Sequence, residues 1–257
     1  MSTSPTSSPG GTKNIVPPRL HFIWLNPPLP SPHPATLQRW TDLNPSFTVT
    51  LWTPALIRER LRVPPWLKEV LESEDSNYGL MSDCLRYLIL RDLGGVYLDL
   101  DYLPITGDLS FLLSKTAASC LSNTRVEGEV NNGFIASGAG GAVVAASLER
   151  CRVWWEQRKG KKSALQGAGI MRFLGAEDAR RLETAVEAIT PEETLRGTGP
   201  LMFTEVCSQL RLDVEVLPKE MFHGVANDAG EAEVESWIKR GVGVGVHLWE
   251  KRWVKRD

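Results

Sequence analysis

Four charged side chains lie close together in one stretch of the sequence, at spacings suited to ligand binding. Asp83 and Arg86 stand three residues apart, and Asp99 and Asp101 flank a single leucine. Residues three apart on a helix are neighbours on its surface, so a carboxylate and a guanidinium fork can be presented together to a hydroxyl-bearing ligand. The two later aspartates can share a hard divalent cation, which prefers oxygen ligands and keeps positions open for substrate phosphates. This stretch therefore predicts a cation site beside a site for a sugar nucleotide.

Each half of the pattern also has an ordinary explanation. Asp83 and Arg86 could form an exposed helix pair that contributes about 0.3 kcal/mol to stability. Aspartate is common in turns, so a single Asp-x-Asp is weak evidence for a metal. Phosphatases with an aspartyl nucleophile also carry Asp-x-Asp at a strand end, usually with Thr or Val two residues later, where this chain has Leu103. The combination favours the cation and leaves a phosphohydrolase as a less favoured alternative.

The flanking residues predict the elements that position these groups. Apolar residues recur at three- and four-residue steps over residues 80–93, which predicts a helix with one buried face. Gly94-Gly95 follows, and glycine commonly ends helices because a left-handed conformation costs it little. Residues 96–98 then predict a short strand, so that the two aspartates come at its carboxyl end.

Predicted strands alternate with predicted helices along the rest of the chain. We expect strands near 20–25, 48–52, 118, 134, 214–217 and 242–247, and helices near 35–43, from 54, from 65, and near 109–113, 141–157, 165–174, 176–188 and 200–210. This alternation predicts an α/β fold with a mostly parallel sheet covered by helices on both faces. Ligands bind such sheets beyond the carboxyl ends of the strands, where the two aspartates are expected.

Bulk properties are those of an ordinary globular protein. The chain has 257 residues, 42% of them hydrophobic and 23% charged, and a net charge of −2, which gives no support to nucleic-acid binding. Residues 1–13 predict a disordered low-complexity tail, and residues 14–257 a single domain. The four cysteines are widely spaced, so neither a zinc site nor a disulfide framework is indicated. Neither a signal peptide nor a membrane span is visible, and we therefore expect a cytoplasmic protein.

The central motifs resemble those of a known group of enzymes. The block Ser-Asp-x-x-Arg-Tyr over 82–87, followed by Gly-Gly-Val-Tyr-Leu-Asp-x-Asp-x-x-Pro over 94–104, resembles the sugar-binding DXD glycosyltransferases that include yeast-type α-1,6-mannosyltransferases. It is also similar to the glucosyltransferase domains of large clostridial toxins, as is His-Phe-Ile-Trp over 21–24. The similarity extends from about Arg19 to Trp253. It implies a GT-A fold, a Rossmann-like nucleotide-diphosphosugar domain.

The resemblance implies roles for residues of the central block. Asp83 and Arg86 would bind the ribose and the transferred sugar. Asp99 would contact the ribose or sugar and help to hold the metal, and Asp101 would be the direct metal ligand. Trp24 would stack on the nucleotide base, although a core position is its ordinary alternative.

Further roles fall on residues outside the block. Asn132 or its neighbour Asn131 would bind a sugar hydroxyl, or the pair forms a turn before a strand. His247 would complete the metal shell, and Trp253 would close over the diphosphate, where Arg252 replaces the serine of the family pattern. The segment 198–200 resembles a loop near the acceptor cleft, and its Thr-Gly-Pro sequence also predicts an ordinary helix start.

The implied activity is that of a metal-dependent retaining hexosyltransferase. The cofactor would be Mn²⁺ or Mg²⁺, and the donor UDP-glucose or another UDP-hexose, with GDP-mannose as the alternative. The acceptor would be a hydroxyl of a glycan, a lipid, a small molecule or a protein. A non-catalytic nucleotide-sugar-binding protein remains open as an alternative, with Arg252 marking lost catalysis.

Overall fold

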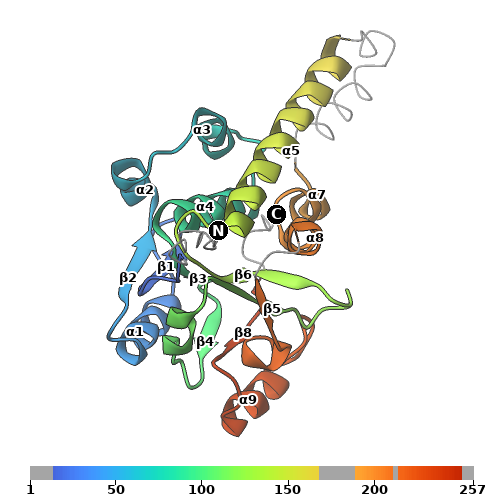
Figure 1. The fold of residues 1–257 in the computed structure, drawn as a ribbon. Helices are drawn as coiled ribbons and strands as arrows, with labels where there is room; N and C mark the ends of the chain where they lie inside the picture. Colours follow the sequence, from blue (N-terminus) through green and yellow to red (C-terminus); the bar gives the residue numbers. More distant parts are fainter. Residues whose placement is uncertain (1–13, 168–188, 211–213, 251–257) are drawn as a thin grey trace, which may run out of the picture.

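The structure of the chain is a computed structural model that describes residues 14–167, 189–210 and 214–250 (Figure 1). The predicted tail over 1–13 lies outside the described residues. The same is true of the helix predicted over 176–188 and of most of the one predicted over 165–174.

A six-stranded sheet forms the centre of the fold. Its strands are β1 (Arg19–Ile23), β2 (Thr48–Trp52), β3 (Gly95–Leu98), β5 (Ala117–Leu121), β6 (Val130–Ser137) and β7 (Glu215–Leu217), in the order β2-β1-β3-β6-β5-β7. The β1–β2, β1–β3 and β5–β7 pairs are parallel, and β6 runs antiparallel to both β3 and β5. A smaller antiparallel pair joins β4 (Tyr102–Pro104) to β8 (Gly245–His247).

Helices cover both faces of the sheet, as predicted. They are α1 (His33–Leu43), α2 (Pro54–Arg60), α3 (Pro65–Glu72), α4 (Tyr78–Leu93), α5 (Ala142–Gly167), α7 (Pro191–Gly197), α8 (Pro200–Leu210) and α9 (Glu231–Arg240), with 3-10 turns at Ser110–Ser114 and Lys219–Met221. Figure 1 shows the far end of α5 extending away from the sheet. Within the described ranges, no helix combines the length and the apolarity needed to span a bilayer.

Several boundaries differ from the sequence prediction. The helix expected to end near 157 continues as α5 to Gly167, and α7, α9 and β4 were not expected. The last strand is shorter than the predicted 242–247 because Gly241 and Gly243 have φ angles of 65° and 92°, which turn the chain before β8 begins. Such angles favour glycine and interrupt extended backbone.

Side chains of β3 alternate between two apolar cores. Tyr97 belongs to the core shared with α3, α4 and α5, whereas Val96 and Leu98 belong to the core on the opposite face, which contains Trp40 of α1. Alternation across a pleated strand directs consecutive residues to opposite faces. The carboxyl end of β3 is therefore held between two packed layers.

The turn between α4 and β3 requires glycine, as predicted. Gly94 and Gly95 have φ angles of 62° and 115°. A Cβ atom on Gly95 would lie 2.6 Å from the carbonyl oxygen of Arg19 and 3.0 Å from Nε2 of His21. The close approach of β1 to this turn fixes where β3 begins and hence where it ends.

His21 joins the same turn to two strands. Its Nε2 donates to the carbonyl oxygen of Gly94 at 2.9 Å, and its Nδ1 accepts from Nε1 of Trp52 at 3.2 Å, so the contacts select the neutral ring with the proton on Nε2. Burial, opposed by the bond to Gly94 and aided by Arg19, lowers the pKa of His21 to about 4. The folded protein therefore binds fewer protons here than the unfolded chain between pH 4 and 6.5.

The lowered pKa of His21 predicts that this one residue makes the folded protein less stable in acid. As the pH falls from 7 to 5, protonation of His21 in the unfolded chain should remove about 2 kcal/mol from the free energy of unfolding. Urea unfolding at both pH values should show this loss in the wild type and a smaller loss in His21→Gln, which does not titrate. An equal loss in the two proteins would show that His21 does not titrate as described.

Candidate functional site

The two aspartates of the central motif lie at the carboxyl end of β3, as predicted. The backbone N–H of Asp99 donates to the carbonyl oxygen of Gly133 on β6 at 2.9 Å. The carbonyl oxygen of Asp101 accepts from the N–H of Leu248 at 2.9 Å, and its Oδ2 accepts from the N–H of Glu250 at 3.0 Å. The chain segment after β8 therefore fixes the position of the second aspartate.

Asp99, Asp101 and His247 form a cluster that could hold a metal. One ligand atom from each lies within 4.8 Å of the others. The imidazole Nε2 is 3.1 Å from Oδ1 of Asp101, and the buried Nδ1 has no hydrogen-bond partner among the described residues. Two carboxylates and an imidazole suit Mn²⁺ or Mg²⁺ better than a soft metal, so the donor set fits the predicted cation.

Aromatic packing fixes the orientation of the histidine. The His247 ring stacks on Tyr102 with a centroid distance of 4.2 Å and an interplanar angle of 9°. Trp249 packs against the same histidine at 4.1 Å and adopts a φ angle of 56°, in the left-handed region that tryptophan rarely occupies. The backbone thus accepts local strain where it places the histidine and the indole together.

The two aspartates have opposite pKa shifts. Burial raises the pKa of Asp99, and the neighbouring Asp101 carboxylate adds to this, against the lowering effect of Arg86. Burial alone would also raise the pKa of Asp101, but His247 and the N–H of Glu250 outweigh it and lower that pKa. Asp101 is thus the more fully ionised of the two and the stronger candidate for a direct cation ligand.

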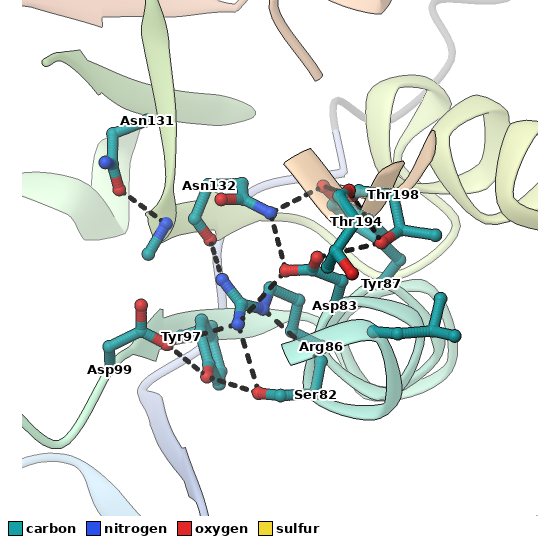
Figure 2. A network of polar contacts seen from close by, with 12 residues as sticks. Ser82, Asp83, Arg86, Tyr87, Tyr97, Asp99, Asn131, Asn132, Thr194 and Thr198 are labelled. Carbon is teal, nitrogen blue, oxygen red and sulfur yellow. Dashed lines mark hydrogen bonds and ion pairs between the residues drawn. The ribbon is translucent and has the colours of Figure 1, made fainter. Parts of the chain in front are cut away.

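Arg86 and its partners form a buried polar network beside this cluster (Figure 2). Nη2 of Arg86 lies 3.2 Å from Oδ1 of Asp83 and 3.3 Å from Oδ1 of Asp99, and Nη1 donates to the carbonyl oxygen of Asn132 at 2.7 Å. Its guanidinium carbon also lies 4.6 Å from the ring centroid of Tyr97. Burial alone would lower the pKa of Arg86, but Asp99, Tyr97 and Asp83 outweigh it, so the group stays charged.

Asp83 has more partners than the sequence suggested. Besides Arg86, its carboxylate accepts from the Nδ2 of Asn132 at 2.8 Å and from the Oγ1 of Thr198 at 2.9 Å. Burial, opposed by these three partners, raises the pKa of Asp83 to about 6. The exposed ion pair considered from the sequence is therefore wrong, because Asp83 and Arg86 are each only 5% exposed.

The two asparagines of β6 point to different partners. Asn132 reaches Asp83 and the hydroxyl of Tyr87, whereas Oδ1 of Asn131 accepts from the N–H of Gly133 at 2.6 Å and from the hydroxyl of Tyr102 at 3.2 Å. Both still line the cavity. The amide of Asn132 therefore helps to position Asp83, whereas that of Asn131 holds the backbone of Gly133 and the hydroxyl of Tyr102.

Three site residues could not be assigned a contact from the sequence. Thr198 caps the carboxyl end of α7 and contacts Asp83, which lies 115 positions earlier in the chain. The ordinary helix start considered for this segment is therefore an incomplete description. The hydroxyl of Tyr97 donates to Oδ1 of Asp99 at 2.6 Å, and that of Tyr102 is 2.6 Å from Nε2 of His223. The motif over 94–104 specifies Tyr97, whereas Tyr102 stands at an unspecified position of it, so only Tyr97 carried a signal.

The predicted residues line a single cavity of about 500 Å³. Trp24 lies at its β1 end, where the indole Nε1 donates to the carbonyl oxygen of Asn26 at 2.6 Å and the ring lies 5.6 Å from that of His33. Members of the polar network and of the metal cluster also line it: Asp83, Arg86, Asp99, Asp101, Asn132 and His247. Arg252 and Trp253 lie outside the described residues.

Comparison with known proteins agrees with this arrangement. Residues 30–116 match the family described as "glycosyltransferase sugar-binding region containing DXD motif". The chain is 32% identical to inositol phosphoceramide mannosyltransferase 3 of Schizosaccharomyces pombe, over 34% of this chain and 24% of the relative. It is 26% identical to "subversion of eukaryotic traffic protein A" of Legionella pneumophila, over 37% and 20% of the respective chains. The chain thus spans about a quarter or less of the length of these relatives.

A solved structure extends the comparison to nearly the whole chain. The catalytic domain of alpha-toxin from Clostridium novyi aligns with a TM-score of 0.60 over 96% of this chain and 81% of that one, at 11% identity. The α/β architecture of the GT-A type predicted from the sequence is therefore confirmed. Asp83, Arg86, Asp99 and Asp101 all lie inside the segment that matches the family model, and the predicted resemblance to the DXD glycosyltransferases is confirmed.

Proposed function

We propose that the chain is a metal-dependent, retaining glycosyltransferase that moves a hexose from a nucleotide-diphosphate sugar to an acceptor hydroxyl. The observation that carries the proposal is the convergence of Asp99, Asp101 and His247 at a strand end inside the cavity. Beside it lies the buried network of Asp83 and Arg86. Carboxylates that hold a cation and a polar network that holds a sugar are the two parts that sugar-nucleotide chemistry requires.

The candidate residues follow one another along the cavity in an order that matches the parts of a sugar nucleotide. The ends of β1, β3 and β6 follow one another across the sheet, and they carry Trp24, then Asp99 and Asp101, then Asn132. A nucleotide base would stack on the tryptophan, the diphosphate would lie at the acidic cluster, and the sugar would face the asparagine and Asp83. Trp253 would add a cover over the diphosphate.

The residues at the site would have different roles in the transfer reaction. Asp99, Asp101 and His247 would hold Mn²⁺ or Mg²⁺, which neutralises charge on a departing diphosphate. Arg86 positions Asp99, because most of its donors already point to protein oxygens. Retention would follow from front-face attack, in which an oxygen of the leaving phosphate accepts the proton of the acceptor hydroxyl.

The donor is proposed as a UDP-hexose, with GDP-mannose as the alternative. The toxin-like motifs over 21–24 and 97–104 favour the first, and the name of the yeast mannosyltransferase relative favours the second. The acceptor would be a glycan, lipid, small molecule or protein, and the place of action the cytoplasm. A nucleotide-sugar-binding protein without turnover is the alternative that binding and turnover measurements would separate.

Removal of Asp101 should abolish cation-dependent function. We expect Asp101→Asn to lower Mn²⁺-dependent release of UDP or GDP from the matching sugar nucleotide on the order of 100-fold or more, because a pre-placed charge would be lost from the transition state. Calorimetry should show that the wild type binds the nucleotide tightly only when Mn²⁺ is present. In Asp101→Asn, binding should be weak, and Mn²⁺ should not strengthen it.

Asp92→Asn is the matched control, because it removes the same charge from a surface residue of α4 that pairs with Arg91. It should keep wild-type turnover. Normal turnover in Asp101→Asn would contradict the metal role. Nucleotide binding without any turnover in the wild type would favour the non-catalytic alternative.

Thr198 offers a second test through the pKa of Asp83. The pKa of Asp83, about 6, predicts an acid limb of the turnover profile near pH 6 in the wild type. Because the Thr198 hydroxyl lowers that pKa, Thr198→Val should move this limb to higher pH. Loss of a hydrogen bond to a charged group should also reduce the free energy of unfolding by roughly 1–3 kcal/mol.

The measurement is turnover from pH 5 to 8 in both proteins, with Thr41→Val as the control. Among the described residues, the Thr41 hydroxyl bonds only to the carbonyl oxygen of Leu37 within α1. An acid limb that stays in place in Thr198→Val would mean that Asp83 does not govern it.

A further inference from the structure

Glu129 is a buried acidic residue that the proposed mechanism does not use. It directly precedes β6, is only 5% exposed and lines the cavity. Its backbone is fixed on both sides, since the carbonyl oxygen accepts from the N–H of Ser122 at 2.8 Å and the N–H donates to the carbonyl oxygen of Val126 at 3.3 Å. The side chain is therefore held at the cavity wall by the hairpin between β5 and β6.

The carboxylate of Glu129 has no hydrogen bond or ion pair with any other residue that the structure describes. Asp83, which is equally buried, has three polar partners. The oxygens of this carboxylate are not among the fully buried side-chain atoms that lack a partner, so they open into the cavity. A hydroxyl group of a ligand in the cavity can therefore donate to Glu129 without displacing a protein partner.

Its position separates it from the groups assigned to the donor. Glu129 comes just before β6 on the hairpin side of Asn132, whereas Gly133, on the other side of Asn132, pairs with Asp99. A donor whose sugar faces Asn132 leaves Glu129 beyond that sugar, where the receiving molecule must approach.

The hairpin wall around Glu129 is anchored to a distant part of the chain. The N–H of Asn227 donates to the carbonyl oxygen of Asn123 at 3.2 Å, and Nη2 of Arg125 lies 3.1 Å from Oδ2 of Asp228. Arg125, Val126 and Asn227 all line the cavity together with Glu129. The part of the cavity wall around Glu129 thus carries polar groups and is joined to residues about 100 positions later in the chain.

We propose that Glu129 is an acceptor-binding residue and that the acceptor presents a polyol, a sugar or cyclitol ring with adjacent hydroxyls. An ionised carboxylate is an acceptor-only group with two oxygens, so it can take hydrogen bonds from two neighbouring hydroxyls. The assignment rests on the proposed glycosyltransferase function and names the chemical class that this site would accept.

The test uses the full chain with Mn²⁺ and whichever of UDP-glucose and GDP-mannose it hydrolyses. Nucleotide release is measured with water alone, then with free glucose, mannose and myo-inositol in one arm and octyl glycosides in the other. Stimulation in the first arm indicates a free polyol, and stimulation confined to the second indicates a polyol head on an apolar tail. 1-Propanol serves as a hydroxyl compound without a diol.

Glu129→Gln should raise the KM for the stimulating polyol roughly 10- to 100-fold, because the amide has lost an ionic acceptor. Hydrolysis with water alone and the dissociation constant of the nucleotide should stay within about twofold of the wild type, a split that a merely structural role would not give. Glu127→Gln is the matched control, since it removes the same charge from an exposed position of the same hairpin and should behave as the wild type.

Equal losses of hydrolysis and polyol transfer in Glu129→Gln would overturn the assignment, as would weakened nucleotide binding. The assignment would also be overturned if the wild type hydrolyses the sugar nucleotide but no polyol increases nucleotide release. The same holds if 1-propanol increases nucleotide release as much as the polyols do. Absence of both nucleotide binding and hydrolysis in the wild type would instead overturn the proposed function, and with it this assignment.

Discussion

The site depends above all on the buried guanidinium of Arg86. It lies on α4, contacts Asp99 after β3 and the backbone of Asn132 on β6, and so joins three elements through one charged group. Burial of that charge would be strongly destabilising without Asp83 and Asp99 beside it. The same pairing keeps two carboxylates close together in the protein interior, where their mutual repulsion would otherwise favour protonation. The guanidinium thus helps to set both the position and the charge state of Asp83 and Asp99.

The sheet determines which residues can meet at this guanidinium. Because β3 alternates between the two cores, Tyr97 points toward α4 and reaches both Ser82 and Asp99 with its hydroxyl. Antiparallel β6 then places Gly133 against Asp99, where a Cβ atom would lie 2.5 Å from the Oδ2 of that aspartate. A residue larger than glycine would displace the carboxylate. The close packing of the β6 backbone against the Asp99 side chain therefore also determines the geometry of the site.

The sequence predicted those parts of the site that are local in the chain. Asp83, Arg86, Asp99 and Asp101 lie within 19 residues, and one helix, one glycine turn and one strand were enough to place them together. Thr198 and Glu129 could not be placed in the same way. Their contacts or positions depend on α7 and on a hairpin whose register includes a shift between Ser119 and Cys120. Helical periodicity and turn signals carry no information on such long-range packing.

His247 illustrates how the distant part of the chain completes the local part. It was assigned from the resemblance alone, and it reaches Asp101 because β8 pairs with β4 in a second small sheet, which sets Tyr102 opposite His247. That pairing was not expected, since β4 has three residues and one of them is a proline. The proline is tolerated because, among the described strands, β4 pairs only with β8 and so lies at a sheet edge. A short edge strand inside the motif thus supplies the register that brings the third candidate ligand to the two aspartates.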